Sequence, residues 1–96
     1  MAQKKATKTE IDLFLEKHTK WSLKKDKLFR EFEFNDFVQA FGFMAQAAIV
    51  AESLDHHPDW SNSYNKVKVE LSTHDAGGIT SLDFNLASKM DSIAKG

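Results

Sequence analysis

The sequence of 96 residues contains no cysteine. Without thiols, the protein has no disulfide framework, no thiolate zinc site and no thiol nucleophile. The absence fits a reducing compartment, and we expect a location in the cytoplasm. Proline is almost absent too, with a single residue at Pro58. Because proline interrupts regular backbone hydrogen bonding, this position marks the end of a regular element.

A strong charge of one sign is also missing, since the formal net charge is -1. Such a balance gives no general attraction to nucleic acid or to an anionic membrane surface. Lysines are locally dense between Lys17 and Lys27, but Glu16 and Asp26 interrupt them. We interpret this stretch as a solvated surface and predict no direct contact with nucleic acid.

No apolar run approaches the roughly 20 residues of a transmembrane helix, so we predict no membrane partner. Residues 1–8 lack the apolar segment of a secretory signal, and we interpret them as a flexible polar tail. The apolar content of 42% is that of a folded globular protein rather than a disordered one. We therefore expect one domain over residues 9–96.

The spacing of apolar residues predicts an α+β fold. The strand over 66–73 shows the clearest pattern, because apolar and charged residues alternate strictly, as in a half-buried antiparallel strand. The expected elements are a helix over 9–17, strands at 21–23 and 27–34, a helix over 36–54, strands at 60–64 and 66–73, and a helix opening at 80–83. This order, α-β-β-α-β-β-α, predicts a four-stranded antiparallel sheet with three helices packed on one face.

Capping residues mark the helix starts. Thr9 and Asn35 are the expected N-caps of the first two helices, and Thr80 opens the last one. The long helix over 36–54 is apolar around nearly its whole circumference, which predicts burial on two sides. We expect the second side to mediate self-association; the alternative is an unusually enclosed helix in a monomer.

The segment from Glu52 to Trp60 is the first candidate for chemistry. Pro58 disfavours helical geometry at His57, so the long helix ends at or before that residue. His56 and His57 are then displayed on a short turn. Their imidazoles can give and take protons near neutral pH.

His74 is the third candidate, at the exit of the strand over 66–73. If that exit lies beside the end of the long helix, three imidazoles share one pocket and can act as general acid and base without a cofactor. The alternative is that each histidine is an ordinary loop residue, as we expect for His18 at the surface. A metal site of His57 and His74 with a nearby carboxylate, Asp55 or Glu52, can also be drawn. The spacing of these residues in the sequence does not favour such a site, and we predict that no metal is bound.

Three further residues have two interpretations each. Glu52 falls inside the apolar arc of the long helix, where a carboxylate needs a partner such as a histidine or a ligand N–H, unless the helix end frays into water. Asp83 supports the chemistry or completes a capping box with Thr80. Trp60 stacks on a flat ring or packs into the core.

Taken together, these motifs resemble the pterin-4a-carbinolamine dehydratase family, over roughly residues 20–94. The stretch Ala40-Phe-Gly-Phe-Met44 resembles its animal members, some of which have cysteine where this chain has Ala76. The motifs are Glu52-x-x-x-His-His-Pro-x-Trp60, Asn-x-Tyr-Asn-Lys-Val67, Ser72-Thr-His74 and Gly-Gly-Ile-Thr80-x-x-Asp83-x-x-Leu-Ala87.

The resemblance implies dehydration of 4a-hydroxytetrahydropterin to quinonoid dihydropterin, a step in tetrahydrobiopterin regeneration, with no added cofactor. It implies that His56, His57 and His74 surround the reacting ring, with His57 as base or positioning group and the other two as acids. The residues implied to contact the pterin or support the histidines are Glu52, Asp55, Pro58, Trp60, Ser72, Thr73, Asp75 and Asp83.

The resemblance also implies a homotetramer, a dimer of dimers joined through the long helices. Animal members serve as dimerisation cofactors of a homeodomain transcription factor, which adds the nucleus as a second location. The alternative function is therefore a non-catalytic binding module. A pure adaptor could lose His57 and His74 without consequence, so their presence together with Glu52 favours the enzyme.

Overall fold

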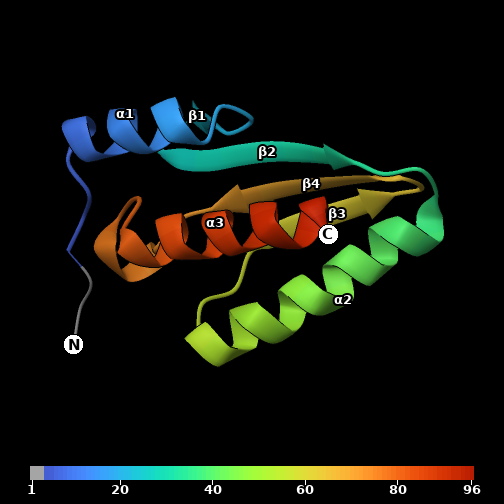
Figure 1. Cartoon of the computed structure of the whole chain (residues 1–96). Coiled ribbons are helices and arrows are strands. Elements are labelled where there is room, and N and C mark those ends of the chain that lie inside the picture. Colours follow the sequence, from blue (N-terminus) through green and yellow to red (C-terminus); the bar gives the residue numbers. More distant parts are fainter. Residues whose placement is uncertain (1–3) are drawn as a thin grey trace.

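The computed structural model describes residues 4–96 and contains the predicted order of elements (Figure 1). The α+β fold class is thereby confirmed. The elements are α1 (Lys8–Lys17), β1 (Ser22–Lys24), β2 (Lys27–Glu33), α2 (Phe37–Leu54), β3 (Asp59–Ser63), β4 (Lys66–Leu71), the short 3-10 helix η1 (His74–Ala76) and α3 (Ser81–Lys95).

The sheet has the strand order β1-β2-β4-β3, and every neighbouring pair is antiparallel. The central pair, β2 and β4, sets Leu28 opposite Leu71 and Phe32 opposite Val67. Since side chains alternate along a strand, these four residues share one face of the sheet. They are all buried, whereas Lys66 and Lys68 on the other face of β4 are exposed.

The helices cover the apolar face of the sheet. The buried side of α2 consists of three alanines and Phe43, and it packs against the sheet. The centroid of the Phe43 ring lies 4.6 Å from that of Phe32 in β2. From α3, Leu86 and Met90 complete the core. In Figure 1, α3 runs along the sheet, α2 crosses below it, and α1 lies near the β1–β2 end. A stacked pair of rings, Phe14 and Phe84, joins α1 to α3 at 4.7 Å.

Two helix starts differ from the prediction. The N-cap of α1 is Thr7, not Thr9, because Thr7 Oγ1 accepts from Glu10 N while the Glu10 carboxylate accepts from Thr7 N, a complete capping box. The N-cap of α2 is Asp36, not Asn35, because the Asp36 carboxylate accepts from Gln39 N at 2.9 Å. The predicted capping box of Thr80 with Asp83 is confirmed in α3.

The expected tail over 1–8 overlaps α1 at Lys8, and its described part touches the domain. Ala6 N donates to Ile79 O at 2.7 Å. Lys5 lies against Gly78, where an added Cβ would come within 2.8 Å of Lys5 Cε. Residues 1–3 lie outside the described residues.

In this single chain, α2 buries one stripe and exposes apolar residues on its other side. Val38 is 77% exposed and Ile49 72%. Burial on two sides therefore requires another molecule, and self-association stays a prediction. By length and composition α2 is also apolar enough to cross a membrane, so our expectation that no segment approaches that limit is wrong. Core helices pass the same test, and absence of a membrane partner stays a prediction.

His18 is not a simple surface residue, contrary to our expectation. Its ring stacks on Phe14 at 4.2 Å, and its Nδ1 lies 3.1 Å from Asp91 Oδ2. Asp91 Oδ1 accepts from Trp21 Nε1 at 2.8 Å and from Arg30 Nη1 at 2.5 Å. This cluster also explains why Arg30 interrupts the apolar face of β2: its charge is paired with Asp91, and its guanidinium lies over the Phe32 ring.

Candidate active site

The end of α2 positions the two neighbouring histidines. Asp55 adopts the left-handed conformation, with φ of 51°, that commonly terminates helices. His56 N then donates back to Ala51 O at 3.0 Å, which turns the chain and buries the His56 side chain. Pro58 follows, directly before β3. Asp55, predicted to contact a ligand, is exposed and has this structural role as well.

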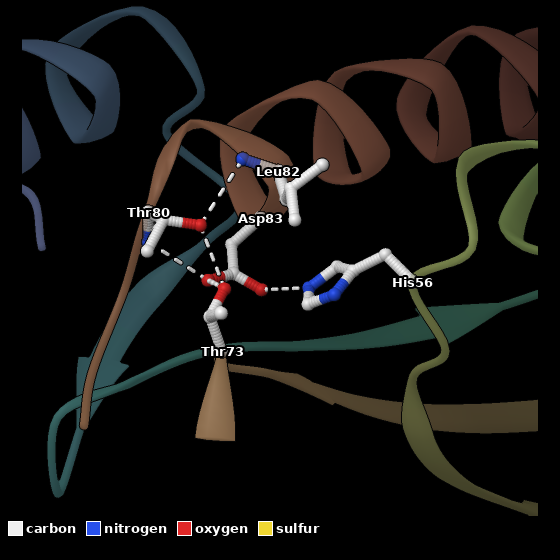
Figure 2. Close-up of polar contacts among 5 residues, drawn as sticks. All are labelled: His56, Thr73, Thr80, Leu82 and Asp83. Atoms are coloured by element: carbon white, nitrogen blue, oxygen red, sulfur yellow. Dashed lines mark hydrogen bonds and ion pairs between the residues drawn. The ribbon is translucent and has the colours of Figure 1, made fainter. Parts of the chain in front are cut away.

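His56 is bound to Asp83, which comes from the first turn of α3 (Figure 2). The distance between Nε2 and Oδ1 is 2.5 Å, and the carboxyl group is fully buried. The second oxygen, Oδ2, accepts from Thr73 Oγ1 and from Thr80 N, both at 2.9 Å. Because an ionised carboxylate only accepts hydrogen bonds, Nε2 of His56 carries the proton in this pair. The proton-accepting position left on a neutral ring is Nδ1.

The hydroxyl groups around Asp83 form a chain with one direction. Thr73 gives its single proton to Asp83, so Thr73 Oγ1 accepts from Thr80 Oγ1 at 2.7 Å. Thr80 Oγ1 in turn accepts from Leu82 N at 3.2 Å. Figure 2 shows this chain reaching His56 through Asp83. Three parts of the chain, the turn after α2, the exit of β4 and the start of α3, are thereby fixed around one buried carboxylate, with each donor matched to an acceptor.

His57 turns to a different partner, so the two neighbouring imidazoles diverge. Its Nε2 lies 2.8 Å from the Glu52 carboxylate. Both side chains are exposed, His57 to 59% and Glu52 to 80%. Glu52 is therefore exposed in the single chain, and of its two interpretations the partnership with a histidine is present.

The loop after β4 meets the turn after α2 at Asp83, since Thr73 and His56 both bind that residue. His74, the first residue of η1, is exposed. It lines a shallow cavity of about 240 Å³ together with Ser72, Thr73 and the turn between β1 and β2. Asp75 is exposed in the same short helix. A pocket shared by all three imidazoles stays a prediction.

Trp60 packs against the core from β3, opposite Val69, in agreement with the packing interpretation. Sequence reasoning missed the role of Thr80 beyond the helix cap and the approach of the β1–β2 turn to His74. The spacing of Thr80 and Asp83 predicts the hydrogen bonds between these two residues, because they lie in one capping box. The hydrogen bond from Thr73 to Asp83 joins separate elements, and no local spacing predicts it.

The carboxylates and imidazoles form separate pairs rather than one cluster that could bind a metal ion. Within residues 4–96, no group of three or more metal-ligating side chains is placed to hold a metal ion. His56 is joined to Asp83 and His57 to Glu52. The proposed set of His57, His74 and a carboxylate is thus not assembled here, and a metal-free site stays a prediction. Such an arrangement can hold and move protons at two separate imidazoles.

Comparison with known proteins decides the family. The family model described as pterin 4 alpha carbinolamine dehydratase matches residues 4–93. The chain belongs to this family. Among its curated relatives, a protein of Solibacter usitatus is 49% identical over 92 residues, which is 96% of this chain and 97% of that relative. A protein of Brucella ovis is 47% identical over 96 residues, 98% of this chain and 99% of the relative. Both carry the name "Putative pterin-4-alpha-carbinolamine dehydratase".

A solved structure of the same family shows the same fold. The crystal structure of transcriptional coactivator/pterin dehydratase from Brucella melitensis aligns with a TM-score of 0.91 and 47% identity. It covers 94% of this chain and 98% of that protein. The resemblance to the pterin-4a-carbinolamine dehydratase family found in the motifs is therefore confirmed over nearly the whole chain.

Proposed function

We propose that this protein dehydrates 4a-hydroxytetrahydropterin to quinonoid dihydropterin and water by histidine acid–base catalysis, in the regeneration of tetrahydrobiopterin. The observation that carries the proposal is the buried His56–Asp83 pair, braced by Thr73 and Thr80, in a chain of the pterin carbinolamine dehydratase family. The two flanking loops supply His57 and His74.

The reaction breaks the bond between C4a and its hydroxyl and forms a double bond between C4a and N5. A base of the protein removes the proton from N5, and an acid of the protein gives a proton to the departing hydroxyl, which leaves as water. The protein therefore gains one proton and loses one in the reaction. In this proposal His56 is an acid: Asp83 accepts from its Nε2 and holds the ring, so that Nδ1 faces the departing hydroxyl. Glu52 accepts from His57 Nε2, which leaves Nδ1 of His57 for the role of base.

In this proposal, His74 is the acid on the other face of the ring. Glu52, Asp83 and Thr73 orient the imidazoles through the hydrogen bonds described above. The remaining proposed contacts to the pterin come from the same two loops and the start of β3: Asp55, Pro58, Trp60, Ser72 and Asp75. No added cofactor or metal takes part.

The exposed side of α2 supports a second proposal, which concerns assembly. Phe41 and Ile49, 58% and 72% exposed, make an apolar surface that a second copy would cover. We propose a homotetramer, a dimer of dimers joined through α2. The same surface is the basis of the alternative function, a binding module for a homeodomain transcription factor, and the Brucella melitensis relative is described as a transcriptional coactivator. The proposed location is the cytoplasm, with the nucleus added if that partner exists.

The test of catalysis is stopped-flow absorbance of freshly generated 4a-hydroxytetrahydropterin. The intact protein should accelerate dehydration, and His56→Ala, His57→Ala and His74→Ala should each lose about 10²-fold or more, the usual share of a positioned acid or base. Lys68→Ala, on the open face of the sheet, is the matched control and should keep full activity. If the protein is folded and oligomeric but does not accelerate dehydration, the proposed enzymatic function is wrong, and the binding module is the remaining function.

A further inference from the structure

The segment that leads into α1 lies across the base of the loop that follows β4 (Figure 1). Ala6 N donates to Ile79 O at 2.7 Å. Ile79 is 2% exposed, and a buried carbonyl group needs a donor of this kind. The Lys5 side chain lies over Gly78, since a Cβ added at Gly78 would come within 2.8 Å of Lys5 Cε. Residues 5–7 are called the N-terminal strap below.

The base of the same loop is closed from its other side by Thr73. Thr73 N donates to Gly78 O at 2.7 Å, and Gly78 N donates to Thr73 O at 3.4 Å, as an isolated antiparallel bridge. The short helix that begins at His74 projects from this bridge. The strap joins the chain one residue after the bridge, so the base of the loop is held from two directions.

The base of the loop leads directly into the buried network at Asp83. Thr80 follows Ile79, and Thr80 N donates to Asp83 Oδ2 at 2.9 Å. The Thr80 hydroxyl is hydrogen-bonded to that of Thr73 at 2.7 Å, and Asp83 holds the His56 ring. The Ile79 carbonyl and the Thr80 N–H belong to one peptide group. The hydrogen bond of the strap and a hydrogen bond to Asp83 therefore lie at the two ends of the same group.

This shared peptide group gives the strap an influence on the site. Because a trans peptide is planar, its C=O and N–H point in fixed opposite directions. The bond from Ala6 to the Ile79 oxygen therefore also fixes the direction of the Thr80 N–H. Hydrogen bonds in a chain polarise one another, so the bond from Ala6 strengthens the bond that Asp83 receives.

We propose that the strap is a positioning element of the candidate site. The amide of Ala6 holds the peptide group before α3 and, through it, the pair of Asp83 and His56. Ala6 acts through Asp83, so it is a positioning residue and not a catalytic one. The inference rests on the proposed dehydratase function. The segment that the sequence predicts to be a flexible tail thus contributes to the reaction.

The test removes the donor of the strap. Ala6→Pro has no backbone N–H but keeps a small apolar side chain, whereas the matched control Ala6→Ser keeps the N–H. We expect kcat for dehydration of 4a-hydroxytetrahydropterin to fall by about tenfold or more in Ala6→Pro, because a small misplacement away from the chemistry can have such an effect. The loss should fall on kcat more than on KM, since the histidines must be oriented in the transition state. Ala6→Ser should keep the rate of the intact protein.

A second control separates positioning from a general loss of stability. Asp36→Ala removes the N-cap of α2 and should lower the unfolding midpoint without touching the strap. At a temperature where both variants are folded, Ala6→Pro should lose activity and Asp36→Ala should not. The ring nitrogen signals of His56 should likewise shift in Ala6→Pro and stay in place in Asp36→Ala. Equal losses of activity in the two variants would overturn the inference.

A measurement on the intact protein decides the matter if Ala6→Pro does not fold. Titration with biopterin, a stable oxidised pterin, should shift the NMR signal of the Ala6 amide and leave that of Thr9 in place. An Ala6 amide that does not respond would overturn the inference. So would equal kcat in the intact protein, Ala6→Pro and Ala6→Ser, which would leave the proposed function standing. An intact protein that does not accelerate dehydration would overturn the proposed function and, with it, the inference.

Discussion

At the scale of one residue, Asp83 links the geometry of the candidate site to folding. Its carboxylate accepts from the start of its own helix, from the strand exit at Thr73 and from the His56 ring. A fully buried carboxylate is stabilised only when its acceptor positions are filled, as they are here. The same bonds fix which His56 nitrogen carries the proton.

Asp83→Asn should reverse that assignment. The amide oxygen can still accept from Thr73 and Thr80, but the amide nitrogen then donates to His56 Nε2, which moves the ring proton to Nδ1. We expect kcat to fall by about 10²-fold or more, as a wrong imidazole tautomer does in other sites. Nitrogen NMR of the ring would report the tautomer. Unchanged tautomer and rate would show that Asp83 does not orient His56.

At the scale of elements, the start of α1 depends on Thr7 and not on Thr9, two threonines of the same short segment. Thr7→Ala should lower the free energy of unfolding by about 1 kcal/mol, the usual cost of losing a cap. Thr9→Ala is the matched control in the first turn of the helix, with an expected change within about 0.5 kcal/mol. Urea denaturation measures both, and equal effects would contradict the observed cap.

A second contact between elements is the ion pair that joins β2 to α3. Asp91→Ala leaves Arg30 largely buried without its carboxylate and removes the acceptor of Trp21 Nε1. We expect a loss of about 2–4 kcal/mol in unfolding free energy, at or just below the range for breaking a buried pair.

The exposed Lys8–Asp12 pair supplies the control for that experiment. Asp12→Ala should change the unfolding free energy by less than about 0.5 kcal/mol, because exposed pairs contribute little. If Asp91→Ala were equally mild, the cluster around Asp91 would not stabilise the packing of β2 against α3.

Local sequence patterns predicted the helices and strands well, but they did not predict contacts between residues far apart in the sequence. Alternation of Val67, Val69 and Leu71 specifies the buried face of β4 because the period is a property of consecutive residues. The predicted starts of two helices differ from the observed ones because several neighbouring polar residues can each serve as the N-cap. Only the backbone geometry selects one of them. The Arg30–Asp91 pair spans 61 positions, and no local pattern reports it. The histidines were found, but their division between Asp83 and Glu52 was not.

At the scale of the whole molecule, the apolar side of α2 predicts assembly. Ile49→Glu places a charge on the exposed side of the helix without touching its buried stripe. If α2 joins the copies, the variant should sediment as a smaller species than the intact protein while keeping its far-ultraviolet circular dichroism. Lys68→Glu, on the open face of the sheet, should not change the sedimentation. An intact protein that sediments as a monomer at micromolar concentration would contradict the assembly.

The hydroxyl chain that ends at Leu82 also has a consequence for observing the site. Amides in the first turn of a helix lack intrahelical partners and normally exchange their hydrogen with solvent quickly. The Leu82 amide instead donates to Thr80, whose hydroxyl is held by Thr73. Its exchange with deuterium can proceed only when that chain opens. The protection of this single amide therefore reports how often the histidine site comes apart, in the resting protein and without any substrate.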